Sequence, residues 1–170
     1  EAMAGIARAI DRDHGGLALA LLNAGVYTPV DGMRMTVGEF RKHVAVNLDG
    51  TVNCLVPAVD AMKPRRRGQV TIVSSVAGYV GLPQAAAYGA TKAGLINLAE
   101  ALKFDLDHLG ILVQLVSPGF VDTPATAQNP FDMPFLLKVD EAADRLVAGL
   151  SRPRFEITFP RAFTYQLKLL

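Results

Sequence analysis

The chain has 170 residues, of which 51% are hydrophobic and 19% are charged, and its 17 basic residues nearly balance its 16 acidic ones. This composition excludes an intrinsically disordered chain. The balanced charge removes the electrostatic argument for nucleic acid or an anionic membrane surface as a partner. The length predicts a single domain that spans residues 1–170.

A mean hydropathy of +0.27 raises the question of a membrane segment. The longest apolar stretch, Leu17–Leu22, is far shorter than the roughly 20 residues that a spanning helix needs. The single cysteine, Cys54, excludes an internal disulfide framework and fits a reducing compartment. No export signal is recognisable at the start, and the three histidines show no metal-ligand spacing with Cys54. We therefore expect a cytoplasmic protein with no integral membrane segment and no metal site.

Short apolar runs account for much of the high apolar fraction. The first three are near-continuous rather than alternating, which is typical of parallel strands that helices cover on both faces. The four strands predicted from these runs are Leu17–Leu22, Val70–Ser74, Ile111–Val116 and Phe155–Phe159.

Longer segments with helical spacing alternate with these runs. Gly15-Gly16 and Gly110 are helix-ending signals, Thr36-Val-Gly-Glu39 is a capping-box pattern, and Pro57 predicts a kink. The alternation predicts an α/β fold with a doubly wound, Rossmann-like parallel sheet. The predicted helices cover residues 1–13, 36–62, 85–109 and 140–150, with a terminal amphipathic helix from about Arg161.

Small and hydroxyl residues follow three successive predicted strands. In an open parallel sheet, ligands bind at the carboxyl ends of the strands, so these segments are candidates for the rim of one site. Gly, Pro and Ser also mark ordinary turns, and each segment alone is equally consistent with a turn. The segments are Asn23-Ala24-Gly25, Ser74-Ser75-Val-Ala-Gly78 and Ser117-Pro118-Gly119-Phe-Val121-Asp-Thr123.

A sharper signal is Tyr88-Gly-Ala-Thr-Lys92 at the start of a predicted helix. The spacing places Tyr88 and Lys92 one turn apart on a face that continues through Leu95 and Ala99, so the pair points inward. A phenol titrates near pH ~10, and a neighbouring ammonium lowers that pKa toward a usable general acid/base. Alone the pattern is weak, because a snorkelling lysine beside a half-buried tyrosine is the simpler interpretation.

Further residues in a fixed order strengthen this signal. Ser75 lies thirteen residues before Tyr88, and Asn47 lies inside the preceding helix. With Asn23-Ala24-Gly25 and Pro118-Gly119-Phe-Val-Asp-Thr123, the sequence resembles the short-chain dehydrogenase/reductase family over nearly its whole length. One local departure is Leu22, where the family usually has a second asparagine before Ala-Gly.

The resemblance implies a role for each matching residue. Tyr88 donates a proton to the carbonyl oxygen or removes one from the alcohol, and Ser75 hydrogen-bonds the substrate oxygen. Lys92 lowers the pKa of the tyrosine and binds the nicotinamide ribose, while Asn47 holds a water that links Lys92 to solvent. The implied cofactor is NAD or NADP. The implied cofactor-binding residues are Asn23, Ala24, Gly25, Tyr88, Lys92, Pro118, Gly119, Val121 and Thr123.

The family's glycine-rich phosphate loop, Thr-Gly-x-x-x-Gly-x-Gly, is not found in residues 1–170. The residue that selects NAD or NADP is missing with it. Aligned by its motifs, the chain starts at about the third helix of the family, so we expect a Rossmann-like domain that is incomplete at its N-terminal side.

These observations predict an NAD(P)-dependent oxidoreductase that interconverts an alcohol and a carbonyl compound. The segment Asn129–Leu137 is rich in Phe, Met and Leu, which suggests an apolar small-molecule substrate, although these side chains could instead pack beneath the loop. The alternatives are a non-catalytic, truncated member that acts as a binding or assembly module, and a related epimerase or dehydratase. The resemblance further implies a homodimer or homotetramer that pairs the helix of Tyr88.

Overall fold

The computed structural model describes residues 2–129 and 131–169. Three positions of the sequence-based predictions lie outside these residues. They are Glu1 at the start of the first predicted helix, Pro130 in the apolar segment, and Leu170 at the end of the predicted domain.

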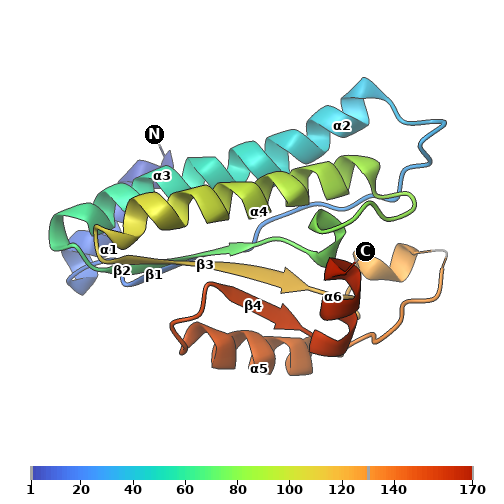
Figure 1. The fold of residues 1–170 in the computed structure, drawn as a ribbon. Coiled ribbons are helices and arrows are strands. Elements are labelled where there is room, and N and C mark those ends of the chain that lie inside the picture. Colours follow the sequence, from blue (N-terminus) through green and yellow to red (C-terminus); the bar gives the residue numbers. More distant parts are fainter. Residues whose placement is uncertain (1, 130, 170) are drawn as a thin grey trace.

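Within the described residues, the sheet contains four parallel strands, whose arrows in Figure 1 all point the same way. Their bounds agree with the predicted strands to within two residues at each end. In spatial order the strands are β1 (Leu19–Leu22), β2 (Gly68–Val73), β3 (Ile111–Pro118) and β4 (Glu156–Phe159).

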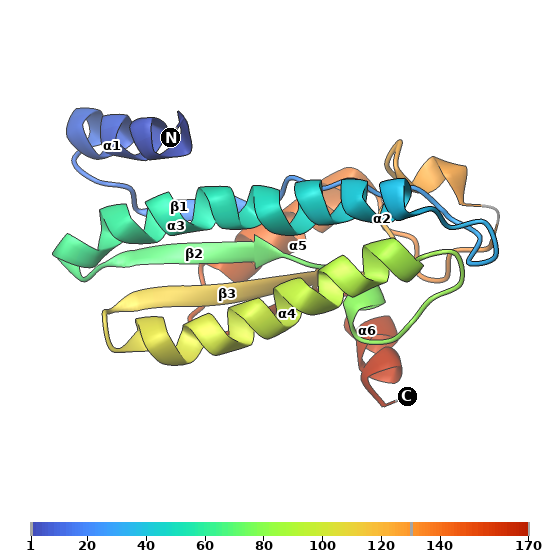
Figure 2. The same cartoon turned by 90° about the horizontal axis from the view of Figure 1, so that it is seen from above.

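Helices cover both faces of the sheet, which confirms the predicted α/β, doubly wound architecture (Figure 1). Helices α3 and α4 lie on one face and α5 lies on the other, while α1 packs beside α3 (Figure 2). No helix among the described residues is both long and apolar enough to cross a membrane. The α-helices are α1 (Ala2–His14), α2 (Val37–His43), α3 (Gly50–Met62), α4 (Ala86–Asp107), α5 (Val139–Leu150) and α6 (Arg161–Lys168).

The predicted helix over 36–62 is continuous but not α-helical throughout. Thr36 caps it as predicted: its hydroxyl accepts a hydrogen bond from the Glu39 backbone N–H, and the Glu39 carboxylate accepts one from the Thr36 N–H. The change in helix geometry lies before Pro57, because residues 44–49 form a π-helical turn between α2 and α3. Such wide turns are frequent at functional sites, and this one contains the fully buried Asn47.

The main apolar core lies between the sheet and helices α3 and α4. A smaller cluster fills the other face beneath α5. Only the outer strand β1 leaves large apolar side chains uncovered, since Leu19 and Leu21 are 39% and 40% exposed. Burial of the strands therefore accounts for much of the high apolar fraction. The main core includes Leu55, Val59, Met62, Val70, Ile72, Leu95, Ala99, Leu106, Ile111, Val113 and Leu115.

One polar side chain, Gln114, is completely buried in β3 and ties the sheet to the turn between α5 and β4. Its amide nitrogen donates hydrogen bonds to the backbone carbonyls of Arg152 and Arg154, at 2.8 and 3.0 Å. Its amide oxygen accepts a hydrogen bond from Gln69 at 2.6 Å. These bonds fix where β4 begins.

We expect Gln114→Leu to lower the free energy of unfolding by about 2–3 kcal/mol, because it leaves several buried polar groups without partners. Chemical denaturation measures the effect. The matched control is Gln166→Leu on the exposed surface of α6, which should change stability by less than about 0.5 kcal/mol. Equal effects of the two substitutions would contradict the role assigned to Gln114.

Candidate functional site

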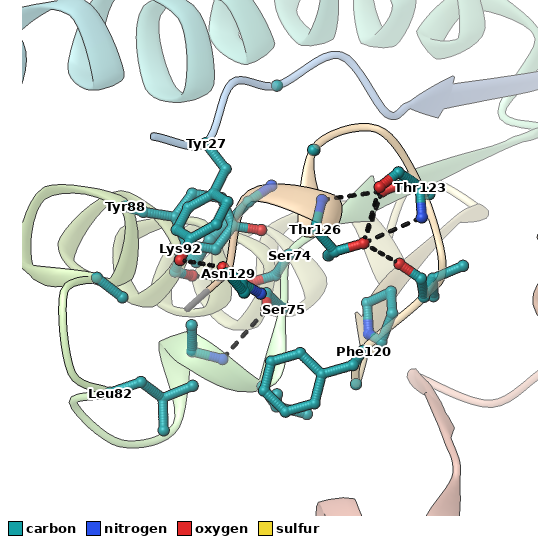
Figure 3. A pocket seen from close by; sticks show the side chains of 18 of the residues that line it. Tyr27, Ser74, Ser75, Leu82, Tyr88, Lys92, Phe120, Thr123, Thr126 and Asn129 are labelled. Atoms are coloured by element: carbon teal, nitrogen blue, oxygen red, sulfur yellow. Dashed lines mark hydrogen bonds between the residues drawn. The ribbon is translucent and has the colours of Figure 1, made fainter. Parts of the chain in front are cut away.

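The carboxyl ends of β1, β2 and β3 surround a cavity of about 230 Å³ (Figure 3). Nine of the eleven predicted site residues line it. Ala24 and Asn47 do not line the cavity. The nine residues are Asn23, Gly25, Ser75, Tyr88, Lys92, Pro118, Gly119, Val121 and Thr123.

Ser75 reaches the cavity because the chain turns sharply after β2. It caps a short 3-10 helix over Val76–Gly78, and its hydroxyl accepts a hydrogen bond from the Ala77 backbone N–H at 3.2 Å. The serine side chain is thereby held half-buried at the end of the strand, on the side from which Tyr88 of α4 enters (Figure 3).

Two glycines let α4 approach this turn closely. A Cβ on Gly89 would lie 2.9 Å from the Ala77 carbonyl oxygen, and a Cβ on Gly78 would lie 2.8 Å from the carbonyl carbon of Lys92. Real Cβ atoms essentially never come so close to backbone atoms. The two glycines therefore set the separation between Ser75 on the turn and Tyr88 and Lys92 on the helix.

Lys92 is an almost completely buried cation, with only 4% of its surface exposed. Its Nζ donates a hydrogen bond to the Val73 carbonyl at 2.9 Å, and its own carbonyl accepts one from the Ser74 hydroxyl at 2.8 Å. Burial disfavours the ammonium form and lowers the pKa of Lys92 to about 8. The predicted inward-facing position of this lysine is confirmed.

The pKa of Tyr88 differs from the sequence-based expectation. Burial of the phenol raises its pKa to about 12, against a smaller lowering by the Ser75 hydroxyl and with a further rise from the neighbouring Tyr27. Lys92 does not bring the pKa down, because its Nζ lies 5.5 Å from the centre of the tyrosine ring and is hydrogen-bonded to the backbone. The phenol in this environment is a proton donor that stays protonated at neutral pH.

Asn47 lies behind the cavity and supports the segment that follows β1. Its side chain makes two hydrogen bonds to the backbone of Val26, accepting from the N–H at 2.8 Å and donating to the carbonyl at 3.0 Å. It also donates to the Thr91 hydroxyl on α4 at 3.0 Å. These bonds join the loop after β1 to the helix of Tyr88. The predicted water-holding role of Asn47 stays a prediction.

The loop after β3 is held by threonine hydroxyl groups. Thr123 donates its backbone N–H to the Thr126 hydroxyl at 3.0 Å, and the two hydroxyl groups lie 3.2 Å apart (Figure 3). Gly119 is in contact with the end of β4, since its N–H donates to the Phe159 carbonyl at 2.8 Å. The predicted segment from Pro118 to Thr123 is thereby folded along one wall of the cavity.

Other residues that the sequence reasoning did not single out also line the cavity, and they include Tyr27, Leu82, Phe120 and Thr126. Tyr27 lies two residues after Gly25, and Phe120 lies within the segment Pro118–Thr123, so the identified residues beside them were the available signal. Leu82 lies in the connection before α4, where no residue pattern distinguishes it from an ordinary loop residue.

A second cavity, of about 480 Å³, lies along β4 between α5 and α6. It contains none of the predicted site residues. Its charged lining residues are Arg145, Arg152, Arg154, Arg161 and Glu156.

The fold and the first cavity define a Rossmann-like α/β protein with a tyrosine and a buried lysine at the carboxyl edge of its sheet. A sequence profile described as short chain dehydrogenase matches residues 1–133. The chain belongs to the short-chain dehydrogenase family, which is a family of oxidoreductases.

Individual relatives agree with this assignment. The chain is 38% identical over 153 residues to an uncharacterized oxidoreductase of Myxococcus xanthus (strain DK1622), covering 90% of the chain and 60% of that protein. It is 38% identical over 112 residues to a 3-oxoacyl-(acyl-carrier-protein) reductase of Staphylococcus aureus (strain N315), covering 66% of the chain and 46% of that protein. The chain thus spans roughly half to three fifths of these relatives.

A solved structure, "ElxO with NADP Bound", superposes with a TM-score of 0.79 at 22% sequence identity. The match covers 92% of this chain and 71% of that one. At this level of identity the similarity shows the fold, and the bound NADP is a property of that protein.

We expect Gly89→Ala to lower the free energy of unfolding by about 1–3 kcal/mol, because the new methyl group meets the Ala77 carbonyl. Gly5→Ala in α1 is the control, since nothing lies within 4 Å of a Cβ there. That substitution should be neutral or stabilise by up to about 1 kcal/mol through helix propensity. Denaturation curves of both variants measure these changes in the free energy of unfolding. Stabilisation by Gly89→Ala would show that helix α4 and the turn after β2 are not in tight contact.

The buried Lys92 predicts a specific dependence of stability on pH. Its pKa is about 8 in the folded chain against 10.5 for an unburied lysine, so the folded chain loses this proton at a lower pH than the unfolded chain does. The free energy of unfolding contributed by this group therefore rises between pH 8 and 10, by about 2 kcal/mol. Lys92→Met should remove the rise, whereas Lys42→Met on the exposed face of α2 should keep it. A rise that persists in Lys92→Met would contradict the assignment.

Proposed function

We propose that this protein catalyses the NAD(P)-dependent interconversion of an alcohol and a carbonyl compound, with Tyr88 as the general acid/base. The observation that carries the proposal is that Ser75, Tyr88 and Lys92 line one cavity at the carboxyl edge of the sheet. This combination supports an enzyme rather than a non-catalytic binding module, for which a buried lysine beside a phenol would only cost stability.

In the proposed reaction the Tyr88 phenol donates its proton to the substrate oxygen, while the Ser75 hydroxyl donates a hydrogen bond to the same oxygen and stabilises its developing charge. A pKa of about 12 keeps Tyr88 protonated at neutral pH, as donation of a proton to the substrate oxygen requires. The bound dinucleotide supplies the hydride.

The residues around the cavity fit the nicotinamide end of such a dinucleotide. Gly25 leaves space beside the Lys92 ammonium group, because a Cβ at this position would lie 3.6 Å from the lysine Nζ. That Nζ makes one hydrogen bond, to Val73, and an ammonium has three donors, so it can also bind a ribose hydroxyl. Asn23 and Thr123 add polar groups to the same cavity. The NADP in the solved relative supports this assignment.

We further propose an apolar substrate. One side of the cavity is lined by Val76, Leu82, Phe120 and Phe131, and the two phenylalanine rings meet edge-to-face with centroids 5.9 Å apart. The predicted apolar loop contains residues of two kinds, some that line the cavity and some that pack against other side chains. Phe131 lines the cavity, whereas Phe135 packs on Phe163 of α6.

We also propose that the protein forms a homodimer or a homotetramer, and that the chain forms a single domain. Apolar side chains on the outer surfaces of α3 and α4 support association, since Val56 is 52% exposed and Phe104 is 75% exposed. Burial of such side chains against a second copy would be favourable.

The proposed function is tested by Tyr88→Phe in the intact protein. The substitution keeps the ring and removes the proton donor, so kcat should fall by about 10²–10⁴-fold. Affinity for the dinucleotide should change by less than about threefold, because the ring and Lys92 remain. The measurements are the rate of NAD(P)H oxidation with an apolar ketone and a fluorescence titration with the dinucleotide.

Tyr165→Phe, on the exposed side of α6, is the matched control and should keep full activity. Undiminished turnover by Tyr88→Phe would overturn the assignment of the general acid. A wild-type protein that binds no dinucleotide would support the binding-module alternative. Turnover of substrate without net oxidation of NAD(P)H would instead indicate an epimerase or a dehydratase.

A further inference from the structure

Tyr27 lies directly over Tyr88 in the cavity, although it belongs to none of the motifs that identified the site (Figure 3). The two rings meet edge-to-face, with centroids 4.9 Å apart and planes inclined by 62°. Tyr27 comes from the loop after β1, whereas Tyr88 comes from the first turn of α4. One wall of the cavity beside the proposed proton donor is therefore an aromatic ring from a distant part of the chain.

The backbone on both sides of Tyr27 is fixed by buried side chains. Asn47 holds both the N–H and the carbonyl of Val26, as described above. On the other side, the Thr28 N–H donates to Nε2 of His43 at 3.3 Å. Nδ1 of the same imidazole lies 2.8 Å from the Glu39 carbonyl, which can only accept, so the imidazole donates from Nδ1 and accepts at Nε2.

The tip of the Tyr27 side chain is fixed as well. Its hydroxyl donates to Oδ1 of Asn129 at 2.9 Å, across 102 positions of sequence. Asn129 is itself held in the loop after β3, because its backbone N–H donates to the Thr126 carbonyl at 3.0 Å. The ring is thus tethered at its backbone and at its hydroxyl, and it cannot swing aside without breaking one of these bonds.

The other walls differ in this respect. Leu82 and Phe120 line the cavity with side chains that have no polar group to form a hydrogen bond, so apolar packing alone holds them. Tyr27, in contrast, is an aromatic wall of the cavity that is held by hydrogen bonds to the backbone beside it and by a hydrogen bond from its hydroxyl group. A cavity of about 230 Å³ leaves limited room beside the Tyr88 hydroxyl.

We infer that Tyr27 is a specificity-determining residue. Its fixed ring restricts the substrates to carbonyl compounds whose substituent on the Tyr27 side of the carbonyl group is slim. The expected substrates are then apolar ketones or aldehydes that have a bulky substituent on no more than one side of the carbonyl group. The inference rests on the proposed function, because it concerns the group bound at Tyr88.

The test compares two ketones in the intact protein, butan-2-one as the slim substrate and acetophenone as the wide one. In Tyr27→Ala the ratio of kcat/KM for acetophenone to that for butan-2-one should rise at least tenfold over wild type, the scale on which pocket size discriminates substrates. In Tyr27→Phe, which keeps the ring, the ratio should stay within about threefold of wild type. Tyr165→Ala, which removes a tyrosine outside this cavity, should leave the ratio unchanged.

General damage to the fold lowers both rates together and does not raise the ratio. Tyr27→Leu provides the same comparison with a smaller loss of packing, in case Tyr27→Ala does not fold. If wild type reduces either ketone and neither truncation raises the ratio, the inference is wrong and the proposed function stands. If wild type reduces neither ketone with NADH or NADPH while binding the dinucleotide, the proposed function fails and the inference fails with it.

Discussion

The geometry of the site depends on how closely helix α4 approaches the turn after β2. Gly78 and Gly89 make this approach possible, and the Ser74 hydroxyl closes it with a hydrogen bond to the Lys92 carbonyl. The same helix buries Leu95, Ala99 and Leu106 in the main core. Because interiors are close-packed, the helix cannot shift without repacking that core. The apolar core therefore holds Ser75 and Tyr88 at a fixed separation, even though neither residue belongs to it.

Buried polar groups gather on the side of the core where the strands end. His43, Asn47, Thr91 and Lys92 are all at least 96% buried, and each has a hydrogen-bond partner in the described chain. A buried polar group without a partner costs about 1–3 kcal/mol, so alternative packings that break these bonds are disfavoured. The network contributes less to total stability than the apolar core does. Its main effect is to select one arrangement of the loop after β1, α2 and α4.

Much of the fold follows from local patterns. The strands were predictable because buried parallel strands are continuously apolar, and the start of α2 was predictable because the capping box at Thr36 involves residues only three positions apart. Tyr88 and Lys92 were predictable as an inward-facing pair for the same reason, since helical periodicity places both on one face.

The properties that could not be predicted depend on contacts between distant residues. The Tyr88 pKa rises mainly because the folded chain buries the phenol, with a further rise from the neighbouring Tyr27, whereas the sequence shows only the nearby lysine. Asn47 contacts Thr91 across 44 positions, and Tyr27 contacts Asn129 across 102. The position of Tyr88, the proposed proton donor, thus depends on the rigid junction of β2 and α4, whereas cavity shape depends on two loops that meet only in the folded chain. Substitutions in the loops can therefore change the shape of the cavity without moving the turn and the helix that position Ser75, Tyr88 and Lys92.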